Sequence, residues 1–78
     1  MNRKIRLIWD FHGVDSEGTA EHHVKHLVQF MNREELQCLR TAVFTANDMH
    51  HMACMTVNEK DVRIIRDTLK PHRAVIVE

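Results

Sequence analysis

The sequence predicts an α+β fold with the element order βαββαβ. Three observations predict it: alternating apolar and polar residues in several short stretches, two stretches with apolar residues at helical spacing, and short breaks between them. The 78 residues are enough for a single domain, residues 1–78. A chain this short buries only ~60% of its unfolded surface, so association with a partner would add stability.

A strand is predicted first, at about residues 3–11. Its apolar side chains occupy every second position: Ile5, Leu7, Trp9 and Phe11. A loop follows at 12–14, and either Asp15 or Ser16 is placed to cap a helix at about 17–33. Apolar residues at intervals near 3.6 indicate this helix: Ala20, Val24, Leu27, Val28 and Met31.

The middle of the chain alternates again, over residues 39–57. Asn47-Asp48 suits a tight turn that divides this stretch into two strands. Pairing across that turn places one set on the inner face, toward the helices: Ala42, Phe44, Ala46, Met49, Ala53, Met55 and Val57. The open face is then expected to carry Ile8, Leu39, Val43, Met52 and Cys54, mixed with Thr41, Thr45 and Thr56.

A second helix and a fourth strand complete the chain. Asn58 can cap the helix, and Pro71 ends it. The inner stripe of this helix is Val62, Ile65 and Leu69. The last strand is predicted at 72–78.

This order of elements resembles the ferredoxin-like fold, and the resemblance covers the whole chain. It implies a four-stranded antiparallel sheet in the order 4-1-3-2 with both helices on one face. Many unrelated activities use that fold, so the resemblance alone implies no function. An open sheet face with this much apolar area is rarely left in water, which predicts a homodimer through the open face ahead of a tolerated mixed surface.

Composition excludes several classes of function. Eleven basic residues balance eleven acidic ones, so no overall charge attracts nucleic acid or an anionic membrane. No apolar run approaches the ~20 residues of a membrane span, and no signal-peptide pattern is present, so a cytoplasmic location is expected. Cys38 and Cys54 lack the spacing of a disulfide framework or zinc motif and are interpreted as reduced thiols.

Three of the seven histidines lie within AEHHVKH, residues 20–26. On the predicted helix His22 and His26 face solvent, one turn apart. Such a pair can chelate zinc or nickel, but two ligands alone indicate at most a weak metal site, and a solvated surface is the preferred interpretation. No HExxH motif accompanies them, and no cofactor is predicted.

The other histidines are expected to converge. In the assumed topology the ends of the strands bring His12, His50, His51 and His72 to one end of the sheet, near the first turns of the helix. Side-chain parity places His12 and His50 on the open face with Asp10. It places His51 on the helix side with His23, at a partly buried edge where desolvation lowers a histidine pKa. The six candidate ligand-binding residues are Asp10, His12, His23, His50, His51 and His72.

Several known families with this fold have sequence signatures that this chain lacks. The open face lacks the aromatic residues with which RNA-recognition motifs stack bases, and the first loop lacks the CxxC of heavy-metal-associated domains and the arginine of acylphosphatases. Two cysteines are too few for a ferredoxin cluster. Residues 10–14, DFHGV, are similar to the D-x-x-G-V opening of ACT domains, a resemblance that implies binding of an amino acid at a dimer interface.

Catalysis has weaker support. Cys54 and His50 are four residues apart on a strand, about 13 Å, which is too far for direct proton transfer. Asp10 with His12 has the residue types of a general acid/base pair, but no oxyanion site or second catalytic carboxylate accompanies it. The sequence therefore predicts a small non-catalytic binding or regulatory domain with a histidine-rich site. The alternatives are an ACT-like sensor, a transition-metal-binding module, an enzyme with its site at the dimer interface, and a domain that binds another protein.

Overall fold

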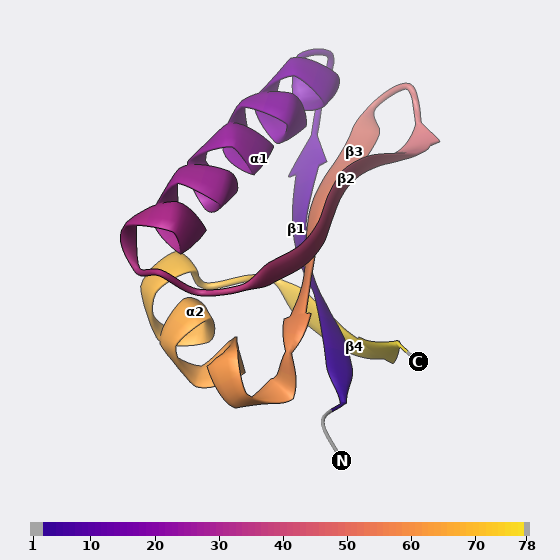
Figure 1. Ribbon diagram of the computed structural model, residues 1–78. Coiled ribbons are helices and arrows are strands. Elements are labelled where there is room, and N and C mark those ends of the chain that lie inside the picture. The colour runs from indigo at the N-terminus through magenta and orange to yellow at the C-terminus, as the bar shows by residue number, and fades with distance from the viewer. Residues whose placement is uncertain (1–2, 78) are drawn as a thin grey trace.

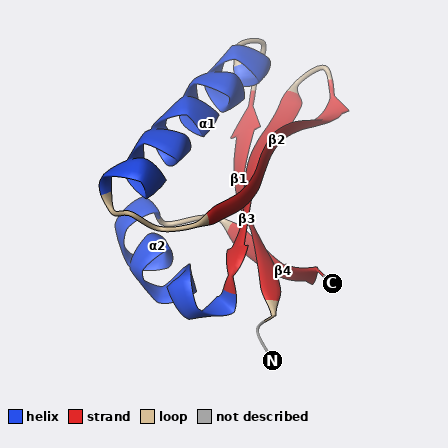
Figure 2. Cartoon of the chain, viewed as in Figure 1, coloured by secondary structure: helices blue, strands red, loops and turns tan. Residues whose placement is uncertain are grey.

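The computed structural model describes residues 3–77, and the strands and helices follow the predicted order. The elements are β1 (Lys4–His12), α1 (Ser16–Arg33), β2 (Cys38–Asn47), β3 (His50–Asn58), a 3-10 turn η1 (Glu59–Asp61), α2 (Val62–Leu69) and β4 (Arg73–Val77). The four strands form one antiparallel sheet in the order β2-β3-β1-β4, which is the predicted order read from the opposite edge. Both helices lie on the same side of the sheet in Figure 1, and Figure 2 separates the two layers by colour.

The core lies between the two helices and the sheet. Leu7, Leu27 and Met55, from three different elements, are fully buried there. The alternation in the sequence predicted that Ile5, Leu7, Trp9 and Phe11 face the helices. This prediction is confirmed: the first three are buried and Phe11 is partly buried. The indole Nε1 of Trp9 donates a hydrogen bond of 2.8 Å to the carbonyl of Leu69, which fixes the end of α2 to β1.

The predicted register of the β2–β3 hairpin is wrong by one residue. The turn is Asp48-Met49, and the Asn47 side chain accepts a hydrogen bond of 2.8 Å from the amide of Met49. A register irregularity between Thr45 and Asn47 leaves Ala46 as a bulge, so Val43 pairs with Ala53. A second irregularity interrupts the pairing at Leu39.

This shift exchanges the two faces of β2. Pairing places three residues predicted on the open face on the inner face instead: Thr41, Val43 and Thr45. It places two residues predicted inside on the open face: Ala42 and Phe44. Met49, also predicted inside, is a half-exposed turn residue. On β3 the prediction is confirmed, because Ala53, Met55 and Val57 are buried in the core.

The open face covers much of its own apolar surface. Ile8 and Cys54 are buried although no helix lies over them. Long neighbouring side chains lie across this face, as when the Arg6 guanidinium sits 5.4 Å from the centre of the Phe44 ring. The large apolar residues on this face that stay substantially exposed are Phe44 and Val75.

The helix ends differ from the predicted caps. Asp15 occupies the N-cap position of α1 and Asn58 that of η1, but neither side chain makes a capping hydrogen bond. The chain leaves α2 through Lys70, which has a positive φ of 49°, and Pro71 follows. In the described part of the chain no helix is long and apolar enough to cross a membrane.

Candidate functional site: a polar cluster around Asp10

Asp10 lies near the end of β1 on the open face and binds two partners from distant parts of the chain. The Arg73 guanidinium donates two hydrogen bonds to the carboxylate, from Nε to Oδ2 at 2.9 Å and from Nη2 to Oδ1 at 2.7 Å. His50 Nε2 lies 2.8 Å from Oδ1, and because a carboxylate only accepts, that nitrogen carries the proton. Three charge-assisted hydrogen bonds therefore hold this side chain in place.

The same contacts set the charge of Asp10. The hydrogen bonds from Arg73 lower the pKa of the carboxyl group below its usual value of 3.8, and the His50 hydrogen bond acts in the same direction. Burial opposes them by favouring the neutral acid, but the lowering prevails. Asp10 is therefore ionised at neutral pH, and its charge is balanced by Arg73.

His72 joins the cluster through the backbone. The amide of Asp10 donates a hydrogen bond of 2.8 Å to His72 Nδ1, and the amide of His72 donates one of 2.9 Å to the carbonyl of Ile8. In the neutral ring the proton is therefore on Nε2. His72 thus extends the pairing between β1 and β4 beyond the first residue of β4.

His12 contacts this group of residues by stacking its ring on that of His50. It pairs with His50 across β1 and β3, and the two imidazole rings lie 4.2 Å apart between centres with 19° between their planes. We refer to Asp10, His12, His50, His72 and Arg73 as the Asp10 cluster. The expected convergence of Asp10, His12, His50 and His72 is present, but the imidazole that bonds the carboxylate is that of His50 and the contact of His12 is a stacked ring.

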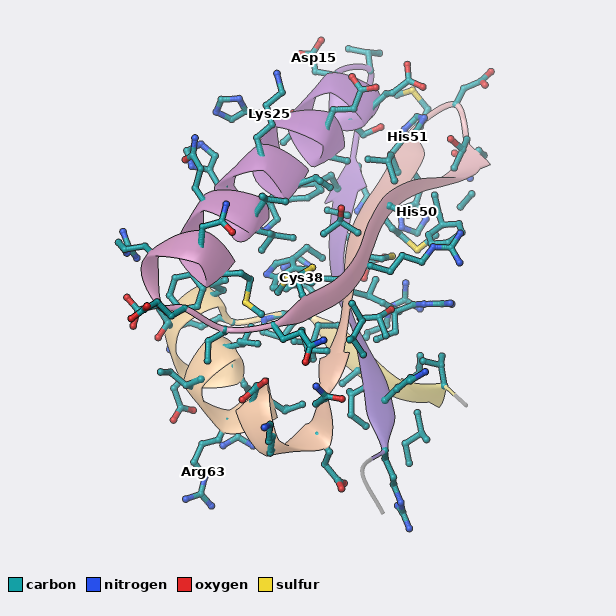
Figure 3. The ribbon with its side chains drawn as sticks, viewed as in Figure 1. Asp15, Lys25, Cys38, His50, His51 and Arg63 are labelled. Atoms are coloured by element: carbon teal, nitrogen blue, oxygen red, sulfur yellow. The ribbon has the colours of Figure 1, made fainter. Side chains whose placement is uncertain are left out.

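His51 lies on the opposite side of the sheet from His50. It is 6% exposed, and its Nδ1 is 2.6 Å from Oγ of Ser16, which is 2% exposed. Its Nε2 is 3.9 Å from the Glu17 carboxylate, beyond hydrogen-bond distance. Both histidines belong to the hairpin end of the sheet, as Figure 3 shows. The helix-side placement predicted for His51 is confirmed.

His23 is also on the helix side, between two aromatic rings. Its ring centre is 5.2 Å from that of Trp9 and 5.4 Å from that of Phe11. Within residues 3–77 its Nε2 is buried without a hydrogen-bond partner. Burial lowers the pKa of His23 below 6.5, and the nearby histidines His26, His72 and His22 add to the lowering.

The pair His22 and His26 is exposed on α1, as expected. The two Nε2 atoms are 2.9 Å apart, so one ring donates a hydrogen bond to the other. Across residues 3–77, no three or more His, Cys, Asp or Glu residues are arranged to hold a metal ion. Only His22 of this pair borders the shallow hollow beside the first turn of α1, which is lined by Val14, Asp15, Glu17, Gly18, Thr19 and His22.

The six candidate residues do not form one site. Asp10, His12 and His50 meet on the open face, and His72 bonds the backbone amide of Asp10 next to the start of β4. His23 and His51 lie on the helix side with different partners. Sequence reasoning missed Arg73 and the Ser16 hydroxyl. A signal for Arg73 existed, because antiparallel pairing of the last strand with the first puts it opposite Ile8, two residues from a carboxylate on the same face.

The buried environments of the two cysteines indicate a structural role. Burial raises the pKa of the Cys54 thiol above 9.0, and burial does the same for Cys38. Both are therefore protonated at neutral pH, and neither is an activated nucleophile.

The chain matches no family model, no curated protein and no solved structure. The prediction that the sequence identifies no specific family is confirmed.

Proposed function

We propose that this chain is a small non-catalytic binding domain and that its ligand binds at the Asp10 cluster. One observation carries the proposal. Side chains from β1, β3, β4 and the segment before β4 converge around a single carboxylate, on the face that the helices leave uncovered. A fixed carboxylate with three imidazoles beside it provides several polar groups in a defined geometry, as a small-ligand site requires.

The proposed ligand is a small anion that carries a carboxylate or phosphate group. Asp10 and Arg73 neutralise one another, so the cluster does not repel an anion overall. The half-exposed guanidinium of Arg73 and the ring N–H groups of His50 and His72 are the donors from which a carboxylate or phosphate can accept hydrogen bonds. An amino acid carries the same carboxylate, and the ACT-like alternative is therefore one case of this proposal.

The fold and the assembly belong to the same proposal. We assign the fold to the ferredoxin-like class, a choice supported by the order of elements and of strands. Phe44 and Val75 are exposed on the open face, but the burial of Ile8 and Cys54 leaves less apolar area than the sequence suggested, so self-association through this face has weaker support than the sequence alone gave it.

Calorimetric titration with inorganic phosphate and with acetate tests the ligand site. We expect both anions to bind, and His50→Gln should weaken their binding about tenfold, because it removes an imidazole N–H group from the cluster. His22→Gln, which changes an exposed histidine outside the cluster, is the matched control and should behave as the wild type. Absence of binding to the wild type, or an unaffected His50→Gln variant, would contradict the proposal.

A further inference from the structure

The outer edge of β4 is open to another strand. Within residues 3–77, β4 pairs with β1 on one side and with no strand on the other. In Figure 1 it lies at the edge of the sheet away from α1. The exposed fractions are 41% for Val75 and 56% for Ile76, and because these residues are consecutive, one extends from each face. The edge therefore presents free backbone groups flanked by apolar side chains.

The other edge of the sheet is protected, and β4 is not. The pairing of β2 with β3 is interrupted near both ends of β2, and such bulges hinder the addition of a further strand. The pairing of β4 with β1 is continuous over all five residues. The only charged residue in β4 is Arg73, and its guanidinium is already bound to Asp10. No bulge and no proline interrupts β4, and its one charge is engaged, so its outer edge is less protected than that of β2.

We propose that a second copy of this chain pairs with β4 in antiparallel orientation, so that the two sheets become continuous. This inference is independent of the ligand proposed for the Asp10 cluster, and it differs from stacking through the open face.

Charge favours a second copy as the occupant. An antiparallel strand pair has twofold symmetry, so each β4 meets an identical surface. If the pair is centred on Val75, the two Arg73 residues lie at opposite ends, about 13 Å apart along the strands, and do not oppose one another. The chain has a formal net charge of zero, so two copies do not repel overall.

Pairing would bury the apolar residues that β4 exposes. Val75 of each copy would meet its counterpart on the open face, and the Ile76 residues would approach on the helix side. Because Arg73 begins β4, each Asp10 cluster would lie close to the interface. The second copy would thereby help to hold Arg73, and with it the carboxylate of Asp10, in place.

Sedimentation equilibrium from micromolar to millimolar protein tests the proposal with three variants. Ile76→Lys introduces a charge beside the edge, at a position exposed enough to tolerate it in the monomer, and should weaken the dimer at least about tenfold. Val14→Lys alters an 80% exposed residue in the β1–α1 loop and should leave the dimer unchanged. Phe44→Lys alters the open face on β2 and should also leave it unchanged.

The three variants separate the possible outcomes. A wild type that stays monomeric at millimolar concentration would overturn the inference, and so would an Ile76→Lys dimer as tight as the wild type. Dissociation by Phe44→Lys without dissociation by Ile76→Lys would show stacking through the open face instead. Circular dichroism of each variant must match the wild type, and concentration-dependent protection of the β4 amides from hydrogen exchange provides a second, mutation-free measurement.

Discussion

Two adjacent histidines on β3 have opposite environments. His51 faces α1, is nearly inaccessible and bonds the buried Ser16 hydroxyl. His50 faces away from the helices, bonds a carboxylate and stacks on a second imidazole. Consecutive residues of a strand always point to opposite faces, so a shift of one position would exchange the two environments.

The comparison indicates which polar groups stabilise the fold and which are available to a ligand. On the helix side the polar contact is isolated in the core, where an unpaired group is costly. On the open side the polar groups form a connected cluster with part of its surface in water. We therefore expect changes on the helix side to affect stability most, and changes on the open side to affect binding.

The largest difference in stability between the two faces of the sheet should come from substitution of the two methionines of β3. Met55 is fully buried on the helix side, and Met55→Ala should lower the free energy of unfolding by about 2–5 kcal/mol. Met52 is half-buried on the open face, and Met52→Ala should cost about 1 kcal/mol. Urea unfolding measures both. Equal losses would mean that the open face is packed as tightly as the core.

The Ser16 hydroxyl should be the next most important group. Ser16→Ala leaves the buried His51 Nδ1 without its partner and should cost about 1–3 kcal/mol. Thr19→Ala in the same helix removes an exposed hydroxyl that bonds the Asp15 carbonyl and should cost much less. If thermal unfolding shows the same loss for both variants, the buried pair contributes nothing beyond an ordinary surface contact.

His23 should make stability depend on pH. Its pKa is lowered in the folded state by burial, so the unfolded chain binds more protons. Its contribution is therefore complete above about pH 6.5, the unfolded pKa, and is lost as pH falls through the folded pKa. His23→Gln should flatten this loss in urea unfolding measured between neutral pH and mild acid, whereas the exposed control His26→Gln should flatten it less. Identical curves for the two variants would place His23 in solvent.

Asp10 should also make stability depend on pH, at lower pH than His23 and with a smaller effect. Its pKa is lowered by Arg73, so it stabilises the fold above its unfolded value of 3.8, and that contribution disappears as pH falls through the folded pKa. Because Arg73 is half exposed, Asp10→Asn should cost only about 1 kcal/mol at neutral pH. Acid titration of unfolding should show the variant and the wild type converging below that range. A difference that persists there would assign the loss to packing.

Metal binding should be the smallest effect. His22 and His26 supply two nitrogen ligands and leave the remaining positions to water, so zinc or nickel should bind weakly, with dissociation constants above about 1 μM. Calorimetry with His22→Ala as control measures this. A tighter site that this variant abolishes would show that α1 carries a metal centre.

The sequence predicts the strands and helices well because their patterns are local. Alternation alone identifies the buried face of β1, and helical spacing alone predicts that His22 and His26 are exposed. The register of β2 depends on a bulge at Ala46 that no local pattern marks, and the faces of Val43 and Phe44 were exchanged as a result. A bulge is chosen by tertiary packing, which a single sequence does not display.

The candidate site was predictable in part for the same reason. The alternation of side chains along β1 and β3 correctly predicted that His12 and His50 lie on the same face as Asp10. The bond that dominates the site, from Arg73, joins residues 63 positions apart, and its geometry depends on where β4 begins. The sequence offers either Asp15 or Ser16 as the helix cap, whereas in the structure Asp15 holds the N-cap position and the Ser16 hydroxyl bonds His51.

Nuclear magnetic resonance of the imidazole groups during a phosphate titration tests the central claim most directly. At about pH 6 we expect phosphate to shift the signals of His12, His50 and His72 together with the Arg73 guanidinium, while His22, His26 and His51 remain unchanged. That result would place the ligand on the Asp10 cluster. Shifts spread evenly over all exposed histidines, or largest at His22 and His26, would contradict the account and leave the Asp10 cluster a structural feature of the sheet.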